Sequence, residues 1–452
     1  MASTLSRSRL AQLLERELTH FRSTHERSAE LHERALRTLV GGVPMPWMMR
    51  WAGGFPVSAR SAQGSRVTDV DGHEYIDLCL GDTGAMTGHS LPALMKVLAG
   101  RDGQGLTLML PTEDAPWVGE ELTGRFGLQR WLFTLSATDA NRAALRICRQ
   151  LTGRSRILVY SYCYHGSVDE AFAISDGNRG TRTREGNVGP AVDPARTTTA
   201  VEFNDLDALE AALSGGEIAC VLAEPAMTNM GIILPLPGYH KALRELCRTH
   251  GTLLIIDETH TISAGPGGCT GEWGLEPDIL TLGKAIGGGV PSGALGMTIE
   301  LQEKMLAQPE ADYEDTGGVG GTLAGNALSL AAMRATLSSA LRREDFDMTI
   351  PLASRFASGV RQVAAERGLA WSVAELGARA EYRFEPRPAR NGTEAHIQTD
   401  QELERYLHLH ALNRGLMLTP FHNMALMAPT TTEADVDRHT ELLAVALDEL
   451  LE

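Results

Sequence analysis

The sequence has little lysine, although it is not poor in basic residues. Only four of its 452 residues are lysines, and most of its 41 basic residues are arginines. Lys96, Lys241 and Lys304 stand in polar, helix-like stretches, as solvated lysines usually do. The fourth, Lys284, follows the apolar run Ile279–Leu282 and precedes a glycine cluster. A chemical role for Lys284 is therefore favoured over a solvated surface position.

Features of several other protein classes are missing. No apolar run approaches the roughly 20 residues that cross a bilayer. Glu15 and Glu17 near the start are not typical of a transit peptide, so we expect a cytoplasmic protein. The formal net charge of −16 argues against nucleic acid or an anionic membrane as a general partner. Six cysteines without a C-x-x-C pair predict buried free thiols in a reducing compartment, and no metal site is expected.

Glycine-rich nucleotide-binding motifs are also absent, but the sequence alternates between strand-like and helix-like segments. No G-x-G-x-x-G follows a first strand, and no P-loop glycine precedes Lys284 at the required spacing. From about residue 95 to residue 340, short apolar runs alternate with helical stretches, which predicts a mostly parallel sheet covered by helices. The predicted strands are Leu132–Thr134, Ile157–Tyr160, Cys220–Ala223, Leu253–Ile256 and Ile279–Leu282.

Three segments are expected along the chain. Residues 1–95 hold helical stretches, an arm rich in Met, Trp and Pro, and a hairpin, and they should form part of a small domain. Residues 96–340 should form the large, cofactor-binding domain. Residues 341–452 alternate helices and short strands, end in the helix Glu433–Leu451, and should complete the small domain. The chain is long enough for two such domains.

Two of the predicted strands end in groups that carry chemistry. Asp257 follows Leu253–Ile256, and Lys284 follows Ile279–Leu282. Open α/β sheets bind ligands at the carboxyl ends of their strands. Pyridoxal phosphate needs a lysine for a Schiff base and a carboxylate that keeps its ring nitrogen protonated. The pair therefore predicts pyridoxal 5′-phosphate as the cofactor.

A phosphate site is predicted at the start of a helix. Ser136, Ala137 and Thr138 follow a predicted strand and open a helix that runs through Arg149. The amides and the dipole at a helix N-terminus favour an anion. A serine-capped helix without a ligand has the same sequence pattern. This motif therefore supports a phosphate site only in combination with the other motifs.

Taken in order, these motifs resemble the class III (subgroup II) aminotransferases of PLP fold type I. The matching segments are D-E-T…G-K-x-x-G-G-G from Asp257, V-x-D-x-D-G-x-x-Y-x-D around a hairpin turn at Asp71, Y-H-G from Tyr164, and G-T-x-x-G-N around Thr322. The resemblance covers the chain from about Ser28 to its end. It implies an α/β fold with a mostly parallel central sheet in a large domain and a smaller α+β domain.

The resemblance implies a role for each matching residue. Lys284 would bind the cofactor aldehyde and move a proton, and Asp257 would face the pyridine nitrogen. Tyr164 and Thr259 would lie against the two faces of the ring, and His165 would be a structural hydrogen-bonding residue. The phosphate would be held by Ser136, by Ala137 in place of the family's usual glycine, by Thr138, and by Thr322 from a second subunit.

The Thr322 contact implies a homodimer with shared active sites. His260 stands where the family usually has Met, Ile or Gln, and the sequence assigns it no role. The substrate candidates are Trp47 and Arg50 in the arm and Glu224 after a predicted strand. Small molecules, an amine donor and a carbonyl acceptor, are the expected partners.

Two reactions compete for this chain. The first is transamination from an amine or a β/ω-amino acid with an apolar or aromatic side chain to a keto acid or aldehyde. The alternative is the isomerase glutamate-1-semialdehyde 2,1-aminomutase, which the run from Glu224 through N-M-G resembles. Three departures favour transamination: no tryptophan near Gly81, an arm arginine displaced from Met48 to Arg50, and no acidic residue in Phe421-His422-Asn423-Met424, where one is expected near the substrate.

Other reactions on the same cofactor stay open. A lyase, a decarboxylase or a racemase would use the same cofactor-binding residues. A cofactor-binding regulator is disfavoured because no basic patch or DNA-binding appendage is visible in the sequence.

Overall fold

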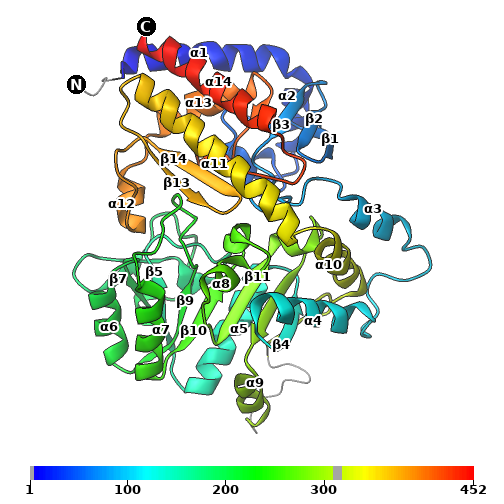
Figure 1. The fold of residues 1–452 in the computed structure, drawn as a ribbon, viewed down its shortest axis with the longest axis vertical. Coiled ribbons are helices and arrows are strands. Elements are labelled where there is room, and N and C mark those ends of the chain that lie inside the picture. Colours follow the sequence, from blue (N-terminus) through cyan, green and yellow to red (C-terminus); the bar gives the residue numbers. More distant parts are fainter. Residues whose placement is uncertain (1–4, 309–317) are drawn as a thin grey trace. The chain divides into compact units, whose positions relative to one another are not determined.

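The computed structural model describes residues 5–308 and 318–452, which group into two compact units (Figure 1). Unit 1 comprises Met1–Leu91, Asp347–Pro388 and Gln398–Glu452. Unit 2 comprises Pro92–Phe346 and Ala389–Ile397. Each unit is described by itself below.

Unit 2 is built on a seven-stranded sheet. Its strand order is β4-β12-β11-β10-β9-β5-β8. Strand β12 runs opposite to the other six strands of this sheet. The expected mostly parallel sheet is therefore confirmed. The strands are β4 (Arg130–Thr134), β5 (Arg156–Tyr160), β8 (Thr198–Val201), β9 (Ile218–Ala223), β10 (Leu253–Asp257), β11 (Ile279–Gly283) and β12 (Gly293–Met297).

Helices cover this sheet, and Figure 1 shows α6 and α7 lying together beside its green strands. Helix α5 carries its apolar residues on one face and packs against the central strands. The helices of unit 2 are α3 (Pro92–Ala99), α4 (Asp114–Phe126), α5 (Ala137–Thr152), α6 (Leu206–Ser214), α7 (Tyr239–His250), α8 (Gly268–Trp273), α9 (Ile299–Leu306), α10 (Ala327–Ser339) and α12 (Gly392–Ile397). A small hairpin, β6 (Ala173–Ser175) and β7 (Thr181–Thr183), completes the unit.

The five predicted strands are confirmed, and β8 and β12 were not predicted. Strand β12 reads GALGM, and glycine is depleted in strands because it has no side chain to pack. Its glycines are needed for close packing. A Cβ on Gly293 would lie 2.5 Å from the carbonyl carbon of Ser136, and one on Gly296 would lie 2.6 Å from the ring of Trp131. Tertiary contacts, not local propensity, therefore make this segment a strand.

Unit 1 contains two small sheets, with strand orders β1-β2-β3-β15 and β13-β14-β16. The strands are β1 (Ala59–Gln63), β2 (Arg66–Asp69), β3 (Glu74–Asp77), β13 (Ser372–Leu376), β14 (Arg379–Arg383), β15 (Leu416–Met417) and β16 (Met424–Leu426). The helices are α1 (Arg7–Thr24), α2 (Glu26–Ala35), α13 (Gln401–Leu412) and α14 (Glu433–Leu451), and α11 (Arg343–Glu366) continues into this unit from unit 2.

The hairpin predicted around Asp71 is confirmed as β2 and β3. The arm from residue 43 to residue 56 holds only the short 3-10 helix η2 (Pro46–Arg50), as its prolines and tryptophans indicate. All six cysteines are buried free thiols. Within residues 5–308 and 318–452, no helix combines the length and the apolar character that a bilayer crossing needs.

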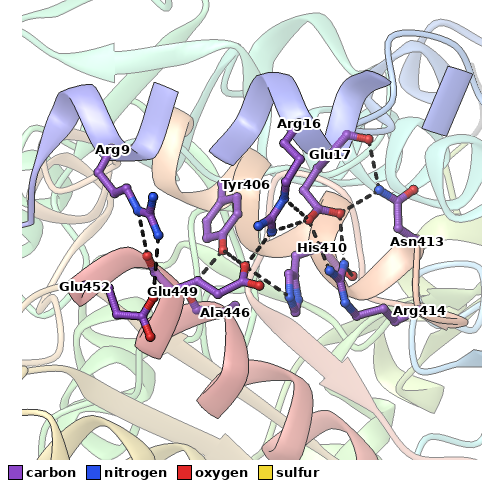
Figure 2. A network of polar contacts seen from close by, with 10 residues as sticks. All are labelled: Arg9, Arg16, Glu17, Tyr406, His410, Asn413, Arg414, Ala446, Glu449 and Glu452. Atoms are coloured by element: carbon purple, nitrogen blue, oxygen red, sulfur yellow. Dashed lines mark hydrogen bonds and ion pairs between the residues drawn. The ribbon is translucent and has the colours of Figure 1, made fainter. Parts of the chain in front are cut away.

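A buried ionic network joins three helices of unit 1, as Figure 2 shows. The carboxylate of Glu17 in α1 accepts hydrogen bonds from Asn413 (2.8 Å), Arg414 (2.9 Å) and Arg16 (2.7 Å). Arg16 also contacts Glu449 of α14 at 2.5 Å. Burial by itself raises the pKa of Glu17, but the hydrogen bonds from Arg414, Asn413 and Arg16 lower it to about 2. Both oxygens of the Glu17 carboxylate therefore have donors, and its charge is paired with arginine.

Candidate active site

Lys284 begins the short 3-10 helix η6 (Lys284–Gly287) directly after β11. Its backbone has φ 49°, in the left-handed region that residues with a Cβ rarely adopt. Strain of this kind is typical of functional sites. The side chain is half-buried, and its Nζ lies 2.7 Å from Nε2 of His260. The amine therefore stands at the carboxyl end of the sheet, beside a titratable side chain.

Asp257 ends the neighbouring strand β10 and is held as an anion. Its Oδ1 accepts from the backbone N (3.0 Å) and Oγ1 (2.6 Å) of Thr259. Its Oδ2 accepts from Nδ2 of Asn141 (2.8 Å) and lies 2.9 Å from Nδ1 of His165. Burial acts to raise the pKa of Asp257, but the hydrogen bond and charge of His165 lower it to about 2. The carboxylate is therefore ionised at any ordinary pH, as a partner of a pyridinium N–H must be.

Asn141 and His165 are the residues that hold Asp257 in place. Nδ2 of Asn141 also reaches the carbonyl oxygen of His165 (3.2 Å), and its Oδ1 accepts from Oγ1 of Thr281 (2.6 Å). The structural hydrogen-bonding role predicted for His165 is confirmed. Asn141 was not predicted as a site residue, although an asparagine on the apolar face of a predicted helix is a signal that it has a buried partner.

Close packing of glycines shapes the start of α5. Ser136 caps this helix, because its Oγ accepts from the backbone N of Asp139 (3.3 Å). A Cβ on Gly283 would lie 2.9 Å from the backbone N of Ala137. The first amides of a helix have no intrahelical acceptor. The end of β11 thus packs directly on the amide of Ala137 at the start of the helix.

Tyr164 and Thr259 stand near these groups with different degrees of exposure. Tyr164 is 41% exposed and packs edge-on against Phe172. Thr259 is buried, and its hydroxyl is committed to Asp257. Gly166, two residues after Tyr164, packs directly on Thr138, whose Oγ1 accepts from the backbone N of Ser167 (3.2 Å). This contact ties the Y-H-G segment to the start of α5.

Glu224 follows β9 and is a buried carboxyl with a raised pKa. Its Oε2 accepts from Oγ1 of Thr228 at 2.5 Å. Its Oε1 has no hydrogen-bond partner within the part of the chain that the structure describes. Burial raises the pKa of Glu224 to about 7, against the lowering effect of His165 and Thr228. The carboxyl can therefore give or take a proton near neutral pH.

The remaining predicted residues are Thr322, Trp47 and Arg50. Thr322 lies in unit 2 on an exposed loop before α10. Trp47 and Arg50 belong to unit 1, where both pack on Phe421. The Trp47 ring meets the Phe421 ring edge-on with centroids 5.3 Å apart, and the Arg50 guanidinium lies 4.9 Å from its centroid.

The residues of unit 2 fit pyridoxal phosphate. Lys284 offers a primary amine, and Asp257 offers a carboxylate that four hydrogen-bonding groups keep ionised. Ala137 and Thr138 offer amides at a helix start from which glycine keeps neighbouring side chains away. The carboxylate and the amine come from neighbouring strands: Asp257 lies opposite Thr281 in the parallel pair β10–β11, and Lys284 follows Thr281 by three residues. Amine, carboxylate and anion site thus come from adjacent elements of one unit.

Comparison with known proteins agrees with this geometry. The sequence pattern of the family Aminotransferase class-III matches residues 48–447. A glutamate-1-semialdehyde 2,1-aminomutase from Roseiflexus castenholzii is 33% identical over 87% of this chain and 90% of its own length.

Two solved structures are similar over nearly their whole length. A glutamate-1-semialdehyde-aminomutase from Pseudomonas aeruginosa PAO1, solved in complex with PMP, has a TM-score of 0.95 and 48% identity, covering 99% of both chains. An omega-transaminase from Sphaerobacter thermophilus has a TM-score of 0.85 and 27% identity, covering 94% of this chain and 97% of that one. The chain therefore belongs to the class III aminotransferases, has PLP fold type I, and is an enzyme whose cofactor is pyridoxal phosphate.

Proposed function

We propose that this enzyme is a glutamate-1-semialdehyde 2,1-aminomutase, which moves an amino group between two carbons of one substrate. The observation that carries the proposal is the similarity to the Pseudomonas aeruginosa aminomutase, at 48% identity over 99% of both chains. Curated relatives that are 31–33% identical carry the same name. This choice reverses the preference drawn from the sequence alone, which put transamination first.

The side chains of unit 2 supply what an amino-group shift needs. Pyridoxal phosphate, when bound, supplies an aldehyde that takes up amines and a ring that withdraws electrons from the adjacent carbon. We propose that Lys284 holds the cofactor aldehyde, and that its released amine carries a proton between substrate and cofactor carbons. Asp257 would keep a proton on the ring nitrogen, because its own pKa of about 2 leaves it negatively charged.

The other predicted residues would bind and orient the cofactor and the substrate. Ala137 and Thr138 would donate amides to the phosphate, and Ser136 would keep the helix start in place through its cap. Tyr164 and Thr259 would lie on the two ring faces. Glu224, with a pKa of about 7, would face the substrate amine or carbonyl. Thr322 would reach the phosphate of a second subunit in a homodimer. Arg50 would bind the substrate carboxylate, and Trp47 would be a further substrate residue.

Transamination to a separate acceptor is the second candidate. Arg50 packs on the Phe421 ring. His422, in the run of residues 421–424 where an acidic residue is expected, lies 3.0 Å from Glu381. This environment differs from the one expected of an aminomutase. Similarity to the omega-transaminase also favours this second reaction.

A single-substrate assay separates the two reactions. Purified enzyme loaded with pyridoxal phosphate is given glutamate 1-semialdehyde with no other amine or carbonyl compound. We expect the isomer to accumulate over many turnovers, because amino donor and acceptor are the same molecule. An enzyme that converts at most one equivalent, and turns over only when a separate keto acid and amine are added, would replace the aminomutase with a transaminase.

A further inference from the structure

The amine of Lys284 has a neighbour to which the chemistry above gives no role. Nε2 of His260 lies 2.7 Å from Nζ of Lys284, within hydrogen-bonding distance. Both side chains are half-buried. The family resemblance leaves this position without a function, since it is usually Met, Ile or Gln.

The two residues of this contact follow neighbouring strands of the sheet. In the parallel pair β10–β11, Asp257 lies opposite Thr281. His260 is three residues beyond Asp257, and Lys284 is three residues beyond Thr281. His260 is thus the third residue after β10 and Lys284 the first after β11, so both follow the carboxyl ends of adjacent strands. The backbone of His260 is also held, because its carbonyl oxygen accepts from the backbone N of Ser263 (3.3 Å) in the short helix η5 (Thr261–Ala264).

The chemistry of the two groups fixes how they interact. A lysine ammonium has three donors and no acceptor, whereas a neutral imidazole has one nitrogen with a free lone pair. At 2.7 Å, the free nitrogen of a neutral imidazole can accept a hydrogen bond from the ammonium. Attack on an aldehyde requires the uncharged amine. A neutral imidazole at this distance can accept a proton from the ammonium and so leave the amine uncharged.

We propose that His260 is a positioning residue that accepts a proton from Nζ of Lys284 and returns it. In this step one N–H bond of the ammonium breaks, its electron pair stays on Nζ, and an N–H bond forms on Nε2 of His260. No oxidant, reductant or further reactant is needed. His260 thereby presents Lys284 as a neutral amine, ready to bind the cofactor aldehyde.

Other titratable groups lie on the elements around His260. Asp257 and Glu258 come from β10 and its end, but their oxygens are held by other groups: Asp257 by Thr259, Asn141 and His165, and Glu258 by Thr261 and Thr270. Glu224 follows β9, and its pKa of about 7 would produce a pH effect of its own. A test must therefore compare variants of His260 itself.

The test measures how fast Lys284 binds the cofactor. Full-length chain freed of cofactor is mixed with pyridoxal phosphate, and the absorbance of the Schiff base is followed from pH 5 to pH 9. We expect H260A and H260Q to react roughly 100-fold more slowly at pH 7, the lower end of what a positioned proton acceptor contributes. The wild-type rate should fall below neutral pH, as an imidazole becomes protonated and can no longer accept. H260Q should lack this fall, and added imidazole should speed up H260A.

The matched control is H250Q, which changes another histidine of unit 2 at the end of α7 and should match the wild-type rate. Circular dichroism and thermal unfolding confirm that each variant is folded, and H260Q keeps most of the ring's volume if H260A is unstable. A wild-type rate and pH profile in H260Q would overturn the proposal, and so would an H260A rate that imidazole leaves unchanged. No amino substrate is present, so failure of the aminomutase proposal would not affect this result.

Discussion

Two buried carboxylate clusters of this protein are built in opposite ways. In unit 1, Glu17 is surrounded by Arg16, Asn413 and Arg414, and its pKa falls to about 2. In unit 2, Glu224 has a single hydroxyl donor on Oε2 and none on Oε1 in the described chain, and its pKa rises to about 7. Burial is similar, so the difference comes from the partners. A cluster that stabilises the fold pairs its charge, whereas a cluster for chemistry leaves a group ready to titrate.

Asp257 shares features with both Glu17 and Glu224. Like Glu17 it is paired and ionised, but its partners are neutral donors and the imidazole of His165, not arginines. Its pKa of about 2 keeps it negatively charged, as a partner of a pyridinium must be.

Replacing the amine at the end of β11 should have the largest effect. We expect Lys284→Ala to lower turnover by about 10⁴-fold, the upper end of what a positioned acid–base group contributes. The measurement is the single-substrate assay, with Lys241→Ala as the control because Lys241 is an exposed lysine of α7. Substantial turnover by Lys284→Ala would mean that another amine holds the cofactor.

Removing the charge of Asp257 should have the next largest effect. Asp257→Asn keeps the shape but loses the anion, so we expect turnover to fall by roughly 100-fold, the size seen when one preorganised electrostatic contact is lost. Because the pKa of Asp257 is about 2, the wild-type enzyme should show no pH effect from this group between pH 5 and pH 9. A variant with wild-type turnover would show that this charge is not needed.

Glu17→Gln should lower stability without altering the chemistry. A lowered pKa means that the stabilisation is present above the unfolded value of 4.5 and is lost as the pH falls toward 2. We expect a loss of about 2 kcal/mol at pH 7, moderated because Arg16 and Arg414 are partly exposed. Urea unfolding of both proteins at several pH values measures it. Equal stability at pH 7 would contradict the structural role of the Glu17 network.

Glu224→Gln should have the smallest effect on stability, and in the opposite direction. A carboxyl whose pKa rises from 4.5 to about 7 on folding loses stability as the pH rises between these values. We expect the variant to match the wild type at pH 5 and to be more stable by about 1 kcal/mol at pH 8, because the amide stays neutral. Urea unfolding at the two pH values measures this. A destabilised variant at pH 8 would place Glu224 with Glu17 as a paired carboxylate.

Much of the fold could be predicted from local patterns. Runs such as Leu253–Ile256 and Ile279–Leu282 are apolar throughout, which is typical of strands buried on both faces. Strand β12 could not be predicted, because its glycines are explained only by the contacts they make with Ser136 and Trp131.

Prediction of the candidate site from the sequence is limited in the same way. Lys284 and Asp257 could be predicted because the cofactor needs an amine and a carboxylate at strand ends. Asn141, which holds Asp257, is 116 residues away in sequence, and no local pattern joins them. His260 and Lys284 meet beyond the ends of β10 and β11, and the pairing of these two strands cannot be seen in either strand alone.

The central claim is that Lys284 is the lysine that holds pyridoxal phosphate. Borohydride reduction of the loaded enzyme fixes the cofactor to its lysine, and peptide mass mapping then identifies the residue. Since the chain has only four lysines, each can be examined separately. We predict the cofactor mass on Lys284 and none on Lys96, Lys241 or Lys304. Cofactor on one of those three, or on none of the four, would contradict the assignment of the active site.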